Sequence, residues 1–169
     1  CDLPDADPQK VKNQLLEYEL ISEDLSGDTL MVEISAKTKK NIDKLLESIT
    51  LQAELLNLKT DYDNKATGIV LESKIDIGRG PIANIIVTSG KLKKGDHFVC
   101  GPQWGKVRAI IDDNGKSVEE ALPSTPVEIL GISGASKSGD DFLVLDTDKE
   151  AKVLSEARIN EAQSKKGQV

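Results

Sequence analysis

Between Thr67 and Asp146 the sequence repeats one pattern: a short apolar segment of strand length is followed by a cluster of turn-forming residues. TGIVLESKID (67–76) alternates apolar and polar residues, and PIANIIVTSG (81–90) is a nearly continuous apolar run. Further segments are DHFVCG, WGKVRAII, PVEILGI and DFLVLD, with IGRG, KLKKGD, DDNG and SKSGD among the turns. Many short strands at such spacing are typical of closed or nearly closed barrels. We therefore predict an antiparallel β-barrel over residues 66–147.

The front of the chain, residues 1–58, has a different pattern. Asp7 is a good helix N-cap, and Pro8 suits the first helical position because its missing N–H costs nothing there. Apolar residues at helical spacing predict a second helix over 41–58, with Asn41 as its cap. TLMVEISA (29–36) predicts a strand between them. Helix, strand, loop and helix form an α/β pattern, which we interpret as the last third of a doubly wound domain.

Two further segments flank the predicted barrel. Polar and turn-forming residues predict a linker over 59–65. From Asp148 onward the spacing of Ala151, Leu154 and Ala157 returns to that of a helix, which predicts a connector helix and tail over 148–169.

Charge is distributed unevenly along the chain, whose formal net charge is −7. Residues 74–108 hold seven cations against Asp76 and Asp96, a local +5. Residues 109–150 hold three lysines against ten acids, a local −7. This pattern fits either an ordinary solvated surface or a positive face on an acidic body, and the second would suit a nucleic-acid partner.

Other sequence features argue against membrane, metal and catalytic functions. No apolar run approaches the roughly 18 residues that span a bilayer, so we expect a cytoplasmic protein, and we expect it to be monomeric. Cys1 and Cys100 lack the spacing of a disulfide framework or a zinc site. His97 has no catalytic motif around it and is interpreted as a barrel side chain. DDNG (112–115) matches a nucleotide-binding DxxG formally but is interpreted as a hairpin turn.

The loop Ser35-Ala36-Lys37 lies between the predicted strand 29–36 and the helix that follows. It resembles the loop that many GTP-binding proteins place against the guanine base, where backbone amides meet the base oxygen and the Lys stem covers one ring face. Such proteins also carry a phosphate-binding loop, GxxxxGK[ST], and this sequence has none. The loop is therefore either an accident or part of an incomplete site.

Several long motifs occur in an order and spacing that resemble one family. They are GRGPIANIIVTSGKLKKGD (78–96), GKVRAIIDDNGKSVEEALPSTPVEILGI (105–132) and GDDFLVLD (139–146). The barrel is similar to the second domain of bacterial translation initiation factor two, a ribosome-dependent GTPase that helps to place initiator tRNA on the small subunit. Segments 2–21, 27–38 and 42–56 resemble the end of the same family's GTPase domain, so we expect a fragment of such a factor.

The resemblance implies an incomplete guanine site. Asp2 would read the guanine edge, and Ser35, Ala36 and Lys37 would close over the base. GTP and magnesium belong to the full-length protein, and we expect neither in this chain, because phosphoryl transfer depends on groups around the phosphates and the metal. We therefore expect no GTP hydrolysis by the chain alone, and we assign it no catalytic residue.

The resemblance also implies partners. The barrel would dock on small-subunit ribosomal RNA, while initiator tRNA would be contacted through domains absent from this chain. The candidate RNA-binding residues are the seven cations Lys74, Arg79, Lys91, Lys93, Lys94, Lys106 and Arg108. Two alternatives stay open: the barrel of an elongation or selenocysteine-specific factor, which would contact the aminoacyl end of tRNA, and a passive spacer domain.

Overall fold

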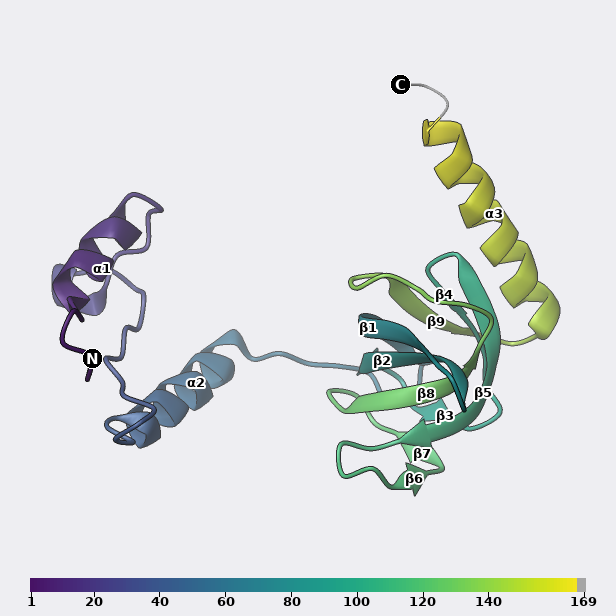
Figure 1. The fold of residues 1–169 in the computed structure, drawn as a ribbon, viewed down its shortest axis with the longest axis horizontal. Coiled ribbons are helices and arrows are strands. Elements are labelled where there is room, and N and C mark those ends of the chain that lie inside the picture. Colours follow the sequence, from purple (N-terminus) through teal and green to yellow (C-terminus); the bar gives the residue numbers. More distant parts are fainter. Residues whose placement is uncertain (167–169) are drawn as a thin grey trace. The chain divides into compact units, whose positions relative to one another are not determined.

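The structure is a computed structural model that describes residues 1–166, and the chain divides into two units. The first unit comprises Cys1–Lys59, and the second, here called the barrel unit, begins at Thr60. Figure 1 shows the elements of both units. Within the described residues, no helix is long and apolar enough to cross a membrane.

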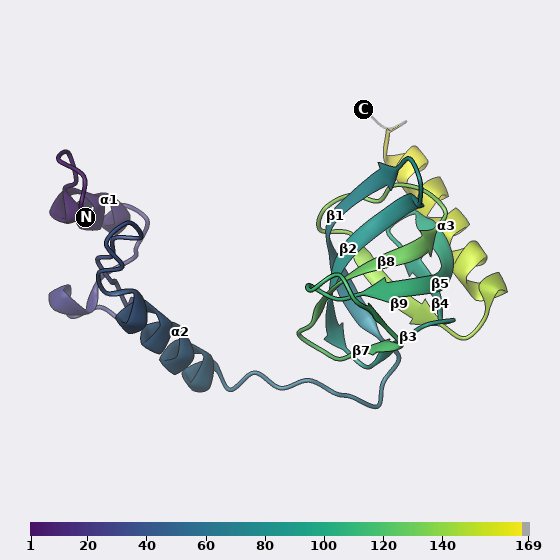
Figure 2. The same cartoon turned by 60° about the horizontal axis from the view of Figure 1, so that its bottom comes forward.

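Six strands of the barrel unit close into an antiparallel ring (Figures 1 and 2). Their order is β4-β9-β1-β2-β8-β5, and β5 pairs back with β4. The strands of this unit are β1 (Thr67–Asp76), β2 (Gly80–Ser89), β3 (Leu92–Lys93), β4 (His97–Cys100), β5 (Gln103–Ile111), β6 (Ser117–Val118), β7 (Glu120–Ala121), β8 (Pro126–Ile132) and β9 (Asp141–Leu145). The predicted barrel is therefore confirmed. The sequence pattern missed β3 and β7, because a strand of two residues is too short to show an alternation of apolar and polar side chains.

The barrel core is filled by side chains from alternate positions of the strands. In β8, for example, Val127 and Ile129 are buried, while Pro126 is exposed. The alternation shifts by one residue at Gly131, whose φ is 110°, and Ile132 is the next buried residue. Only two aromatic rings, those of Phe98 and Phe142, enter the core, and their centroids lie 4.9 Å apart. The core is otherwise aliphatic, as expected for a chain in which aromatic residues make up 3%.

The helix α3 (Asp148–Lys166) packs against the β4–β5 side of the barrel. Polar contacts fix it there: the Ser155 hydroxyl donates to the Pro102 carbonyl, and Arg158 donates to the Gly101 carbonyl at 2.9 Å. The Lys152 ammonium lies 4.5 Å from the centroid of the Trp104 ring, a cation–π contact. The predicted connector helix is present, and residues 167–169 of the predicted tail lie outside the described residues.

The first unit contains α1 (Pro8–Leu16), the short 3-10 helix η1 (Glu23–Leu25) and α2 (Ile42–Leu56). Asp7 caps α1 as predicted, since its carboxylate accepts from the Lys10 N–H at 3.0 Å. Asn41 precedes α2 but does not cap it with its side chain. Its φ is 56°, and its side-chain amide instead donates to the Glu33 carbonyl.

The predicted strand over residues 29–36 is not formed. Only isolated bridges occur there, Ser22 with Thr29 and Ser35 with Lys40. A strand needs a neighbour for its backbone N–H and C=O groups, and the segment around Ser22 pairs only with Thr29 and does not continue beside residues 30–34. The apolar pattern alone could not supply that partner.

The segment between the units is attached to the barrel from Thr60 onward. The Thr60 hydroxyl donates to the Thr88 carbonyl at 2.7 Å. The Asp61 carbonyl accepts from the Gly90 N–H at 2.7 Å and from the Ser89 hydroxyl at 3.2 Å. Two residues of the segment that we predicted as a linker, Thr60 and Asp61, are therefore hydrogen-bonded to the end of β2 and to Gly90.

Gly90 provides a test of this attachment. Its φ is 70°, and a Cβ there would lie 2.3 Å from the Asn64 carbonyl oxygen. Gly139 has a φ of 86° but open space around a Cβ, so Gly139→Ala is the matched control. We expect Gly139→Ala to lower the free energy of unfolding by about 1–2 kcal/mol, and Gly90→Ala by about 3 kcal/mol or more, because the steric cost adds. Urea unfolding followed by the fluorescence of Trp104, the single tryptophan, measures both, and equal losses would contradict the close approach.

The two units should also differ in amide hydrogen exchange. Every fully buried apolar residue of the described chain lies at or beyond Ala66, whereas Leu46, Leu55 and Leu58 of the first unit are 56%, 71% and 79% exposed. We expect strong protection in the barrel strands and weak protection before Thr60, because local opening of the first unit exposes little further apolar surface. Exchange measured by mass spectrometry tests this, and similar protection in both units would show the expectation to be wrong.

Candidate nucleic-acid interface

All seven cations proposed from the sequence are exposed, but the structure does not gather them into one site. Lys74 and Arg79 lie toward the β1–β2 turn, where Asp76 pairs with Gly80. Lys91 lies beyond the other end of that ladder and forms a bridge with Lys65. Residues 67 and 76 are separated by about 30 Å of strand at the usual rise per residue, so these cations belong to different regions of the barrel.

The other four cations come together from two segments. The turn after β3 runs beside the middle of β5, because the Gly95 N–H donates to the Val107 carbonyl at 2.8 Å and the Val107 N–H donates to the Asp96 carbonyl at 2.9 Å. Val107 points into the core, so its neighbours in β5 point outward. We call the four cations of these two segments, Lys93, Lys94, Lys106 and Arg108, the basic patch.

Acidic partners weaken one half of the basic patch. The Lys94 ammonium lies 3.6 Å from the Glu119 carboxylate, and Lys93 is the Cα partner of Glu120 in the β3–β7 ladder. The counting of charges along the sequence missed both glutamates, because they lie beyond the basic segment and reach it only through strand pairing.

The other half of the basic patch is freer. Within residues 1–166, neither Lys106 nor Arg108 forms an ion pair with another side chain. The stem of Arg108 lies close to the backbone of Gly131 in β8. Lys106 and Arg108 therefore present the least compensated positive charge of the patch.

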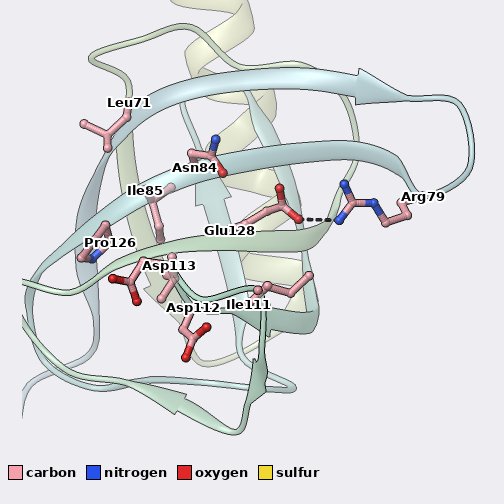
Figure 3. Close-up of a pocket in the computed structure, with 11 residues that line it drawn as sticks. Leu71, Arg79, Asn84, Ile85, Ile111, Asp112, Asp113, Pro126 and Glu128 are labelled. Carbon is pink, nitrogen blue, oxygen red and sulfur yellow. Dashed lines mark hydrogen bonds and ion pairs between the residues drawn. The ribbon is translucent and has the colours of Figure 1, made fainter.

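Arg79 is held by acids. Its guanidinium lies 2.6 Å from the Glu128 carboxylate (Figure 3) and 3.4 Å from that of Asp76. The backbone N–H groups of Gly78 and Arg79 donate to Asp76 and lower the pKa of its carboxyl, and the guanidinium adds to this effect. Arg79 would have to leave Glu128 in order to bind another anion.

The residues proposed for the guanine loop are partly brought together. The Ser35 side chain lowers the pKa of the Asp2 carboxyl, and the Ser35 hydroxyl accepts from the Thr38 N–H at 3.1 Å. The Cys1 ammonium donates to the Ile34 carbonyl at 3.0 Å, which holds the first residues beside this loop. Ser35 is buried, whereas Ala36 and Lys37 are exposed in the turn that follows. The structure thus joins two segments that lie 33 residues apart, as a base-binding site of the predicted kind would require.

The other sequence candidates have structural roles. DDNG forms the predicted turn: the Asp112 carboxylate accepts from the N–H groups of Asn114 and Lys116, and Gly115 has a φ of 77°. His97 lies in β4 as predicted, and its Nδ1 is buried without a hydrogen-bond partner in the described chain. Burial raises the pKa of the Cys100 thiol to about 11, so the thiol stays protonated at neutral pH. Among residues 1–166, no cluster of side chains has the composition of a metal site.

Comparison with known proteins finds that the chain is similar to translation factors. A family model described as elongation factor G domain 2 matches residues 65–145. Translation initiation factor IF-2 of Pelagibacter ubique is 73% identical over 164 residues, which are 97% of this chain and 22% of the relative. Translation initiation factor IF-2 of Cereibacter sphaeroides is 50% identical over 165 residues, which are 98% of this chain and 20% of the relative. The chain therefore spans about one fifth of the length of these relatives.

A solved structure shares the fold. The crystal structure of GDP-bound aIF5B from Aeropyrum pernix matches with a TM-score of 0.73 and 22% identity, over 92% of this chain and 30% of that chain. At this identity the match concerns the fold alone. The relatives above confirm the resemblance to bacterial translation initiation factor two that the sequence motifs predict.

The effect of the Ser35 side chain on the Asp2 carboxyl can be tested by titration. The interaction lowers the pKa of Asp2, so it favours the folded state above the ordinary pKa of an aspartate and is lost as the pH falls through the lowered value. We expect Ser35→Ala to raise the pKa of Asp2, as measured by NMR of the carboxyl carbon between about pH 2 and pH 6. Ser48→Ala is the control, because the Ser48 hydroxyl donates to Lys44 within α2. An unchanged pKa of Asp2 in Ser35→Ala would contradict the contact.

Proposed function

We infer that this chain, which is similar over nearly its whole length to bacterial translation initiation factor two, acts in translation initiation. The identity of 73% over 97% of the chain supports this process, whereas the barrel fold alone would fit many translation factors. We propose that the chain belongs to a GTP-dependent factor that promotes placement of initiator tRNA on the small ribosomal subunit. Contact with the tRNA itself would use other parts of such a factor.

The barrel would dock on ribosomal RNA of the small subunit through the basic patch. The observation that carries this proposal is the pairing of the turn after β3 with Val107, since it sets Lys93 and Lys94 beside Lys106 and Arg108. Helical RNA is recognised mostly through its shape and through contacts with phosphates and sugars, which exposed Lys and Arg side chains can supply. Arg79 would contribute less, because Glu128 and Asp76 already bind its guanidinium.

The first unit would contribute to the base site for GTP. Asp2 would read the guanine edge, and Ser35 would close over the base together with the exposed Ala36 and Lys37. The sequence has no GxxxxGK[ST] loop, so the phosphates and magnesium would need other residues. Binding of GTP would favour one conformation of the factor. The residues of this chain would bind and orient the guanine base of the nucleotide.

Docking on RNA can be measured by its dependence on salt. If about three phosphates are neutralised, log K for binding of the chain to purified small subunits should fall with log salt at a slope of about −2.7. Lys106→Ala with Arg108→Ala should flatten the slope by about two units. Lys93→Ala with Lys94→Ala should flatten it by about one unit or less, because Glu119 and Glu120 already offset part of that charge.

Matched controls separate this proposal from its alternatives. Lys116→Ala with Lys137→Ala removes the same charge from the acidic segment and should change the slope little. Equal effects of all three double variants on the slope would rule out the basic patch as the RNA-binding surface. Weak binding in every protein, the parent included, would favour a passive spacer. Binding only to charged tRNA would favour the role of an elongation or selenocysteine-specific factor.

A further inference from the structure

A groove of ≈ 540 Å³ lies on the outer face of the barrel, across β1, β2 and β8, and is closed at one side by the turn after β5 (Figure 3). It is separate from the basic patch, because none of the four patch residues lines it. Its volume is in the range of pockets that hold small ligands or side chains of a bound peptide. Its lining includes residues of β1, β2 and β8 and of the turn after β5, so an extended occupant would touch several strands.

Part of the groove wall is apolar. Leu71 of β1 is 48% exposed there, and Ile111 and Pro126 contribute further aliphatic surface from β5 and β8. Exposed aliphatic side chains that lie together, with polar groups around them, are typical of interaction sites. This wall offers contact to aliphatic side chains or to the methylene stems of long polar ones.

The charged side chains of the groove are mostly acidic. Asp112, Asp113 and Glu128 line it, against the single guanidinium of Arg79, which Glu128 binds at 2.6 Å. The Asp113 carboxylate is exposed, accepts from the Asn114 side-chain amide, and has no ion pair within residues 1–166. The surplus of negative charge repels RNA phosphates and favours a cation.

We propose that the groove binds an extended basic segment of a protein partner. Its Lys or Arg heads would pair with the carboxylates of Asp113 and Asp112. Their methylene stems, or a neighbouring aliphatic side chain, would cover Leu71 and Pro126. Charge complementarity supports this choice of occupant, because Asp112, Asp113 and Glu128 line the groove against a single guanidinium, and the aliphatic wall offers contact to the side chains beside the cations.

This site is independent of the proposed RNA contact. The basic patch would bind an anionic partner and the groove a cationic one, so one barrel could touch both components of a ribonucleoprotein surface. Failure of RNA docking would leave the groove proposal standing, and the reverse also holds.

The test uses the 169-residue chain and a fluorescent peptide of about seven residues in which leucine alternates with arginine or lysine. Fluorescence anisotropy at low salt should detect saturable binding of this peptide, and little binding of a matched peptide with glutamate in place of each cation. Asp113→Asn should weaken binding about fivefold. Leu71→Ser, at a half-exposed position, should weaken it by a similar factor, about fivefold.

Controls decide whether the groove is responsible. Glu156→Gln removes the same charge from an exposed position on α3 and should leave peptide affinity unchanged, as should Lys93→Ala with Lys94→Ala. Small-subunit binding should be unaffected by Asp113→Asn. The proposal is overturned if the basic peptide does not bind, if the acidic peptide binds equally well, or if Glu156→Gln weakens binding as much as Asp113→Asn. It is also overturned if a helical RNA competes with the peptide but Leu71→Ser has no effect.

Discussion

Closure of the barrel depends on β4, a strand of only four residues that pairs on both sides. His97 and Cys100 are partners of Lys106 and Gln103 in β5, and of Leu145 and Phe142 in β9. Without these two ladders β5 and β9 would be open edges, which expose unpaired N–H and C=O groups. The same strand directs Phe98 and Cys100 into the core and Val99 to the opposite face. The backbone hydrogen bonds of this short strand therefore close the ring, and its side chains contribute to the core.

Closure also decides where charge is placed. Once the strands form a ring, every other side chain must face outward, and a run of charges along the sequence becomes a set of regions on the surface. Lys106 and Arg108 lie in the middle of β5, whereas the acids that follow lie in its terminal turn and in β8. Four of the seven cations thus come together in the basic patch, and three of the ten acids of residues 109–150 line the groove, on the same barrel.

The sequence predicted those features that depend on local periodicity, and it missed those that depend on partners distant in sequence. The long strands, α3 and the Asp7 cap follow from spacing and from side-chain chemistry that act within a few residues. The bond between Arg79 and Glu128 joins positions 49 residues apart, and that between Lys94 and Glu119 arises only when β3 and β7 pair. Residues 29–36 failed to form a strand for the same reason: their apolar pattern is local, but a strand requires a neighbour.

A chain of net charge −7 can still bind RNA if only the charges close to the bound phosphate affect binding strongly. At physiological ionic strength the screening length is about 8 Å, so each cation responds to acids within roughly that distance. Glu119 lies 3.6 Å from Lys94 and offsets it directly. Glu128 pairs with Ile111, which is three residues beyond Arg108 and so roughly 10 Å along the strand. Its charge is also paired with Arg79 at 2.6 Å, so it reaches Arg108 only weakly. Lys106 and Arg108 can therefore present positive charge to a phosphate, although the whole chain would repel it at long range.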